Sequence, residues 1–103
     1  MKKLIIMIIV SLNLFAATLR TTKDGMYFFT RNKDQLNKIL DLAISKDYEA
    51  LDLYINLLIK KGEGGYLKKG VQVYVEKTDW GLVQFRPKGS LDSFWTVSEA
   101  INK

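Results

Sequence analysis

Residues 70–86 have the sequence GVQVYVEKTDWGLVQFR, and this stretch decides the fold. In its first part, valines alternate with polar or aromatic residues, which is the period-2 pattern of a half-buried β-strand. Residues 82–86 predict a second strand, and the intervening TDWG predicts a turn because Gly81 can adopt a positive φ. We therefore expect a β-hairpin in which Tyr74 faces away from the valines.

Short strands are predicted on both sides of this hairpin. Residues 93–97 predict a third strand, in which Phe94 and Trp95 point to opposite faces. We expect Phe94 to point inward and Trp95 to be partly exposed. A last helical turn follows at residues 98–101, and the aromatic run at residues 26–30 predicts a further strand.

Residues 32–61 predict a pair of helices joined by a very short turn. Asn32 and Gln35 have the spacing of a capping box, and Asp47 is placed to cap the second helix. Lys60 and Lys61 favour the negative end of that helix, and Gly62 ends it. The apolar stripes are broad, so we expect them to be core rather than a surface for a partner helix. The stripe of the second helix consists of Ala50, Leu51, Leu53, Tyr54, Ile55, Leu57 and Leu58.

The stretch from Leu67 to Ile101, 35 of the 103 residues, resembles the later part of a bacterial SH3-like (SH3b) domain. The resemblance is carried by LKKG at residues 67–70, the valine strand, DWG at residues 79–81 and FWTV at residues 94–97. It implies a barrel-like sheet. The first strand and long loop of that family have no counterpart here, because the helix pair precedes Leu67 and residues 26–30 are left to supply the missing edge. The predicted class is therefore α+β, with a two-helix hairpin packed on a small SH3-like antiparallel sheet that forms a partial barrel.

The chain begins with Met1, Lys2 and Lys3, followed by an apolar run from Leu4 to Phe15. Twelve residues are too few for a transmembrane helix, which needs roughly 20, but they suit the apolar region of a secretory signal. We predict a signal peptide at residues 1–16, cleaved after Ala16, and a periplasmic protein for which secretion is also open. An uncleaved signal anchor is the alternative. After cleavage we expect no stable membrane span.

The remaining residues divide into a flexible leader at 17–25 and one domain at 26–103, with the helix pair at 32–61 and the sheet at 64–101. The whole chain has 16 basic and 11 acidic residues, for a net charge of +5, and removal of Lys2 and Lys3 lowers this to +3. Such dispersed charge gives little reason to expect nucleic acid as a partner. Glu63, Gly64 and Gly65 predict a flexible connector, since no Lys-Ser/Thr pair follows to form a phosphate loop.

The chain contains no His and no Cys. Their absence excludes disulfides, most metal sites and every nucleophile that depends on a Ser-His or Cys-His pair. Asp47 is explained as a cap, while Glu49 and Asp52 are explained as a solvated helix face. We therefore expect no enzyme, no catalytic residues, no metal and no cofactor.

The residues that offer a binding site are aromatic and basic. Tyr74, Trp80 and Trp95 are predicted to form an aromatic platform, with Arg86 and Lys88 beside it. Such rings stack on sugars or bind peptides. The alternative is ordinary surface packing, with Trp80 as a lid over the end of the barrel.

The leading functional hypothesis is a non-catalytic exported binding module of the bacterial cell envelope. Its partner would be peptidoglycan or an envelope protein. The alternative is a small periplasmic inhibitor or accessory subunit of an exported enzyme. The sequence leaves the oligomeric state open.

Overall fold

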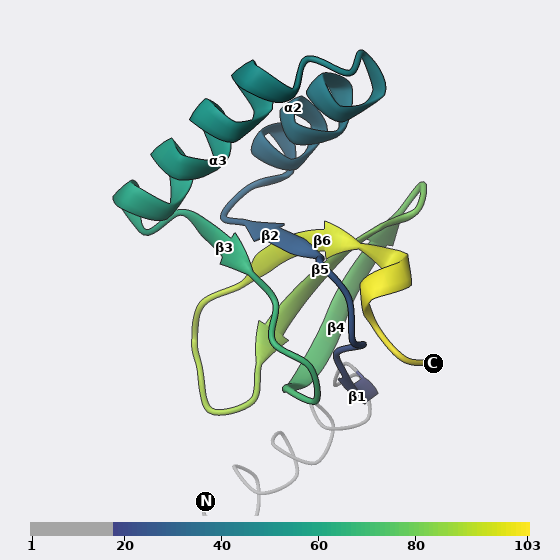
Figure 1. Cartoon of the computed structure of the whole chain (residues 1–103). Helices are drawn as coiled ribbons and strands as arrows, with labels where there is room; N and C mark the ends of the chain where they lie inside the picture. The colour runs from purple at the N-terminus through teal and green to yellow at the C-terminus, as the bar shows by residue number, and fades with distance from the viewer. Residues whose placement is uncertain (1–17) are drawn as a thin grey trace, which may run out of the picture.

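The computed structural model describes residues 18–103, and Figure 1 shows two helices lying over one part of a curved sheet. The predicted α+β class, with a helix pair packed on an antiparallel sheet, is confirmed. The predicted signal peptide and its cleavage site lie outside the described residues. The elements are β1 (Thr18–Thr21), β2 (Phe28–Thr30), α2 (Lys33–Ile44), α3 (Tyr48–Lys61), β3 (Gly64–Tyr66), β4 (Gln72–Asp79), β5 (Leu82–Pro87), β6 (Phe94–Val97) and a 3-10 turn, η1 (Ser98–Ala100).

The six strands form one antiparallel sheet in the order β1-β4-β5-β6-β2-β3. Strands β1 and β3 are its edges, so strand pairing among the described residues does not close a barrel. The register between β4 and β5 shifts between Val75 and Lys77, which leaves Glu76 as the extra residue of a β-bulge.

Both helices begin where the capping residues predict, and α3 also ends at the predicted glycine. The Asn32 side chain accepts a hydrogen bond from the Gln35 N–H (2.9 Å), and the Gln35 side chain accepts one from the Asn32 N–H (3.1 Å). Asp47 accepts from the Ala50 N–H (3.2 Å), and Gly62 ends α3 in the left-handed region at φ 71°. Within residues 18–103, no helix combines the length and the apolar character needed to cross a membrane.

The protein has two cores, one on each face of the sheet. The first consists of Val73, Val83, Phe85 and Ile101, with Phe29 and Phe94 among the half-buried residues packed against it. The second lies under the helices and consists of Phe28, Ile39 and Leu58. The predicted inward orientation of Phe94 is confirmed, and its neighbour Trp95 is half-buried.

The predicted flexible leader at residues 17–25 is wrong for Thr18–Thr21, which form β1 and pair with β4. This pairing provides hydrogen-bond partners for the backbone groups along the edge of β4. An edge strand can form such backbone hydrogen bonds even when its side chains show no apolar pattern. The next residue, Thr22, is 1% exposed, and its backbone bridges to Ile101. Residues 18–22 are therefore an integral part of the sheet.

The predicted flexible connector at Glu63–Gly65 is also wrong, because Gly64–Tyr66 form β3 and pair with β2. Glycine suits this strand because it allows a close approach: a Cβ on Gly64 would lie 2.8 Å from the Phe29 carbonyl oxygen. β2, which was predicted to supply the missing edge, therefore lies inside the sheet between β6 and β3.

Replacing Thr22 should destabilise the fold. Its buried hydroxyl donates to the Lys68 carbonyl and accepts from the Val71 N–H (2.9 Å), so it holds the loop that leads into β4. T22V keeps the side-chain shape and should lower the free energy of unfolding by about 1–3 kcal/mol. T21V is the matched control, since the Thr21 hydroxyl makes an exposed hydrogen bond to Asn102 (3.0 Å). Urea denaturation compares the two, and an equal loss for both would contradict this assignment.

Candidate binding surfaces

Tyr74 and Arg86 lie directly opposite each other on β4 and β5, on the sheet face that points away from the valine core. The Arg86 guanidinium carbon is 4.9 Å from the centroid of the Tyr74 ring. Arg86 also lies 3.6 Å from a Glu76 carboxylate oxygen and donates to the Ser90 carbonyl (3.0 Å). The bulge at Glu76 places this carboxylate beside Arg86, and the same side chain accepts a hydrogen bond from Ser93. Arg86 is therefore engaged by an aromatic ring, an acid and a carbonyl.

Trp95 lies on the same sheet face, opposite Gln84 on β5 and Thr30 on β2. The Lys33 ammonium nitrogen lies 5.9 Å from the centroid of its ring. Lys33 also forms an ion pair with Asp79, at the end of β4. This lysine therefore connects the beginning of α2 to Trp95 and to Asp79, the residue before the turn of the β4–β5 hairpin.

Trp80 and Lys88 lie at opposite ends of β5. Trp80 is at the two-residue loop that connects Asp79 to Leu82, and Lys88 follows the last residue of β5. The six residues of β5 span about 20 Å, so these two side chains are not neighbours. The structure thus brings together Tyr74 and Arg86, puts Trp95 on the same face, and places Trp80 and Lys88 elsewhere.

Trp80 does not act as a lid over the barrel, because its side chain is 98% exposed. Its φ is 50° and that of Gly81 is 81°, which are the positive values that a type I′ hairpin turn needs at both positions. Figure 1 shows the tip of this hairpin, in light green, at the outer margin of the molecule.

The prediction that the apolar stripe of the second helix, α3, is core is wrong for its outer residues. Leu58 is the one buried residue of α3, whereas Leu53 is 67% exposed and Leu57 is 45% exposed. The two helices contact the sheet at β2, β3 and β6, and α3 lies over β3 at the edge, so the sheet covers one side of α3 only. The breadth of the apolar stripe was the feature of the sequence that indicated an exposed apolar surface, because a helix at the edge of a sheet cannot bury so wide a face.

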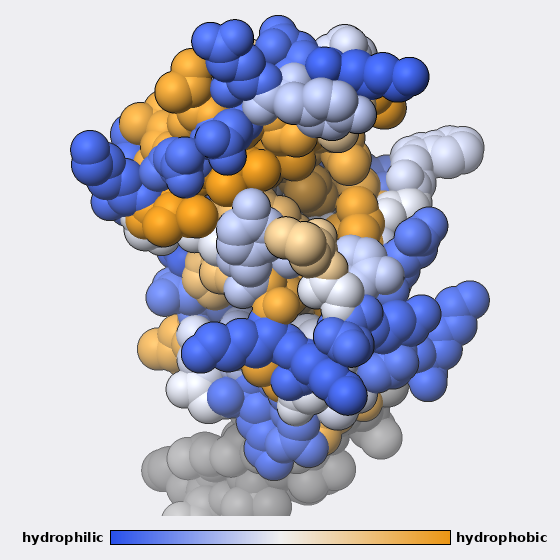
Figure 2. Space-filling view, viewed as in Figure 1, coloured by the Kyte–Doolittle hydropathy of each residue, from blue (hydrophilic) through white to orange (hydrophobic). Residues whose placement is uncertain are grey.

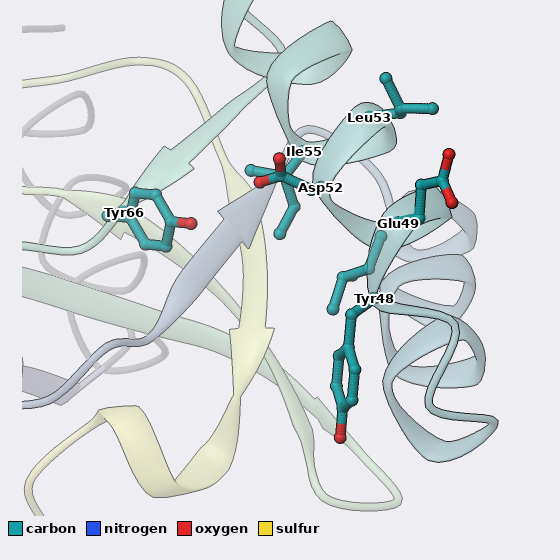
Figure 3. A pocket seen from close by; sticks show the side chains of 7 residues that line it. Tyr48, Glu49, Asp52, Leu53, Ile55 and Tyr66 are labelled. Atoms are coloured by element: carbon teal, nitrogen blue, oxygen red, sulfur yellow. The ribbon is translucent and has the colours of Figure 1, made fainter.

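A hollow of about 610 Å³ opens between α3 and β3. Figure 3 shows Tyr66 of β3 on one side of it and Tyr48, Glu49 and Leu53 of α3 on the other. A second hollow, of about 300 Å³, has an apolar lining that includes Phe29, Phe85 and Phe94. Neither hollow was predicted, because each depends on how distant segments meet.

No group of three or more His, Cys, Asp or Glu within residues 18–103 is arranged to hold a metal ion. Asp47 is a helix cap, and Glu49 and Asp52 lie on the exposed surface of α3. Burial, and then the charge of Glu63, raise the pKa of Tyr54 above its usual value.

No protein-family model matches the chain, and neither curated proteins nor solved structures gave a match.

Arg86 should matter for stability and Lys88 should not. R86A removes the cation–π contact, the ion pair and the carbonyl tether together, so we expect the free energy of unfolding to fall by about 1–2 kcal/mol. K88A removes a neighbouring positive charge from an exposed position and should change it by less than about 0.5 kcal/mol. Urea denaturation of both variants is the measurement, and similar values for the two would show that Arg86 is not a structural link.

Proposed function

We propose that this protein is an exported, non-catalytic binding module of the bacterial cell envelope that contacts an envelope protein through the tip of the β4–β5 hairpin. The observation that carries the proposal is the position of Trp80, fully exposed at the end of a projecting hairpin. Tryptophan is among the residues most enriched at the centres of protein interfaces, where one side chain can supply much of the binding energy.

The backbone at Trp80 supports a role in binding rather than in folding. A positive φ costs a residue with a side chain about 1 kcal/mol, and Asn or Gly is the usual solution at the first position of this turn. Trp80 gains no burial in return, because its side chain is 98% exposed. A bulky aromatic residue at this position is therefore unfavourable for the free protein, and a partner that covers the ring would compensate for the cost.

The residues on both sides of Trp80 are tied to the rest of the molecule, which supports rigid presentation of its side chain. Asp79 forms an ion pair with Lys33 at the start of α2, and the Gly81 carbonyl accepts from the Ser98 N–H (2.8 Å). A side chain held in its binding position before contact loses less conformational entropy when the partner binds.

The sheet face that carries Tyr74, Arg86 and Trp95, which we call the outer sheet face, favours a protein over peptidoglycan as the partner. A sugar needs an open ring to stack on, but the Tyr74 ring already carries the Arg86 guanidinium and the Trp95 ring has Lys33 close to it. Both cations are also paired with acids, Arg86 with Glu76 and Lys33 with Asp79. Each of these two rings therefore has a cation beside it, and each of these two cations has an acidic partner.

The same hairpin supports the second candidate function, a periplasmic inhibitor or accessory subunit of an exported enzyme. A single large side chain at the end of a projecting hairpin has the shape of a plug for an enzyme cleft. The two functions differ in their partner: the second requires a partner enzyme whose turnover falls, or whose assembly changes, when the protein binds.

Export rests on the predicted signal, and the fold is compatible with cleavage. Cleavage after Ala16 would place the new N-terminus at Ala17, immediately before β1, and would remove no described element. We expect the full chain, expressed in a Gram-negative host, to yield a periplasmic species whose intact mass begins at Ala17. A full-length species in the membrane would favour the signal anchor, and a full-length species in the cytoplasm would contradict export.

W80N should separate binding from folding. Asparagine accepts the positive φ of the turn, so the free energy of unfolding should stay the same or rise by up to about 1 kcal/mol. Co-purification of the tagged protein with envelope proteins should nevertheless lose its stoichiometric partner. Addition of the purified protein to that partner then tests for inhibition.

L91N is the matched control, because Leu91 is also 98% exposed but lies in the β5–β6 loop. The control should retain the partner. If W80N retains it to the same degree as L91N, the hairpin tip is not the contact. Retention on purified cell-wall sacculi in place of a protein partner would instead support peptidoglycan binding.

A further inference from the structure

The outer surface of α3 carries a stripe of residues at helical spacing, which we call the α3 stripe: Glu49, Leu53, Asn56, Leu57 and Lys60. All five are exposed, although two of them are leucines. Figure 2 shows hydrophobic residues gathered over the helices, with hydrophilic residues at the margins. The leucines therefore form an apolar centre that the chain itself does not cover.

The charges at the two ends of α3 are of opposite sign. Asp47, Glu49 and Asp52 lie at its beginning, whereas Lys60 and Lys61 lie at its end. The helix pair as a whole has five lysines and five acidic residues, so residues 32–61 carry no net charge. The positive excess of the described chain lies in the sheet and its loops. Two helix pairs can therefore come into contact without repulsion between net positive charges.

We propose that two copies of the chain associate through the α3 stripe, with the two α3 helices antiparallel. Antiparallel packing places Leu53 of each copy beside Leu57 of the other. It also places Glu49 of each copy near Lys60 and Lys61 of the other, since the two ends of the stripe are 11 residues apart and its centre lies between the leucines. The stripe is thus complementary to itself under a two-fold axis, as a symmetric dimer interface requires.

The hollow between α3 and β3 fits this arrangement. It lies beside the acidic end of the stripe, with Leu53, Ile55 and Tyr66 in its lining. In the antiparallel pair, the basic end of the second copy's α3 approaches this end. Ile59 of the second copy, exposed in the single chain, lies on the side of that helix that faces the hollow. The dimer would therefore cover a further apolar side chain of each copy.

Sedimentation equilibrium on the protein recovered from expression of the full chain tests the proposal. We expect a dimer at about 100 µM protein, in the range of weak interfaces of modest size. L53N should raise the dissociation constant of the dimer about tenfold, because it removes the apolar centre. L91N is the control, since it makes the same change at an exposed leucine outside the stripe, and it should leave the constant unchanged.

Charge reversal tests the antiparallel orientation. E49K should raise the dissociation constant about tenfold at low salt, because it puts like charges together at both ends of the symmetric interface. E49K/K60E/K61E should restore it, since both sides of each contact then carry the opposite charge and still attract each other. E99K is the control for net charge, because Glu99 is exposed on η1. Circular dichroism confirms that each variant remains helical.

Three results would overturn the proposal. The first is a wild-type protein that remains monomeric up to about 1 mM, a concentration at which even weak specific dimers form. The second is an equal effect of L53N and L91N on the dissociation constant. The third is a triple variant that associates no better than E49K, which would mean that the acidic and basic ends of α3 do not meet.

Discussion

The rest of the structure depends on the two adjacent phenylalanines of β2. Because neighbouring residues of a strand point to opposite faces, Phe28 packs under the helices while Phe29 packs against Phe85 and Phe94 in the other core. The strand that carries both phenylalanines, β2, is only three residues long. The buried Thr96 hydroxyl of β6 donates a hydrogen bond to the Phe28 carbonyl (2.9 Å). The helix pair and the sheet are therefore joined through one short strand that contributes to both cores.

This arrangement determines which surfaces remain open. The helices lie over the β2–β3 end of the sheet, so they leave the β4–β5 hairpin uncovered and one side of α3 without a neighbour. The outer sheet face between these two regions is largely committed to internal contacts, as the environment of Arg86 illustrates. The surfaces best placed to meet another molecule are thus the hairpin tip and the α3 stripe, and they differ in chemistry.

The sequence predicts best those features that local chemistry controls. The caps at Asn32 and Asp47, the left-handed end at Gly62 and the alternation around Val73 all appear where their patterns indicate. The strands β1 and β3 were missed because backbone pairing creates them, and Gly64 and Gly65 carry no side-chain pattern. The platform was predicted from residue types and from the alternation of side chains along the strands. The predicted platform residues do not all lie together, because the length of β5 puts Trp80 and Lys88 at its opposite ends.

The central claim is that Trp80 contacts a protein in the cell envelope. Its most direct test is to place a photo-crosslinking amino acid at position 80, and in a parallel strain at position 91, and to irradiate living cells. The account predicts one dominant adduct of fixed mass from position 80 and none from position 91, because both positions are equally exposed but only the first lies on the rigid hairpin. Adducts absent at position 80, or the same at both positions, would contradict the account.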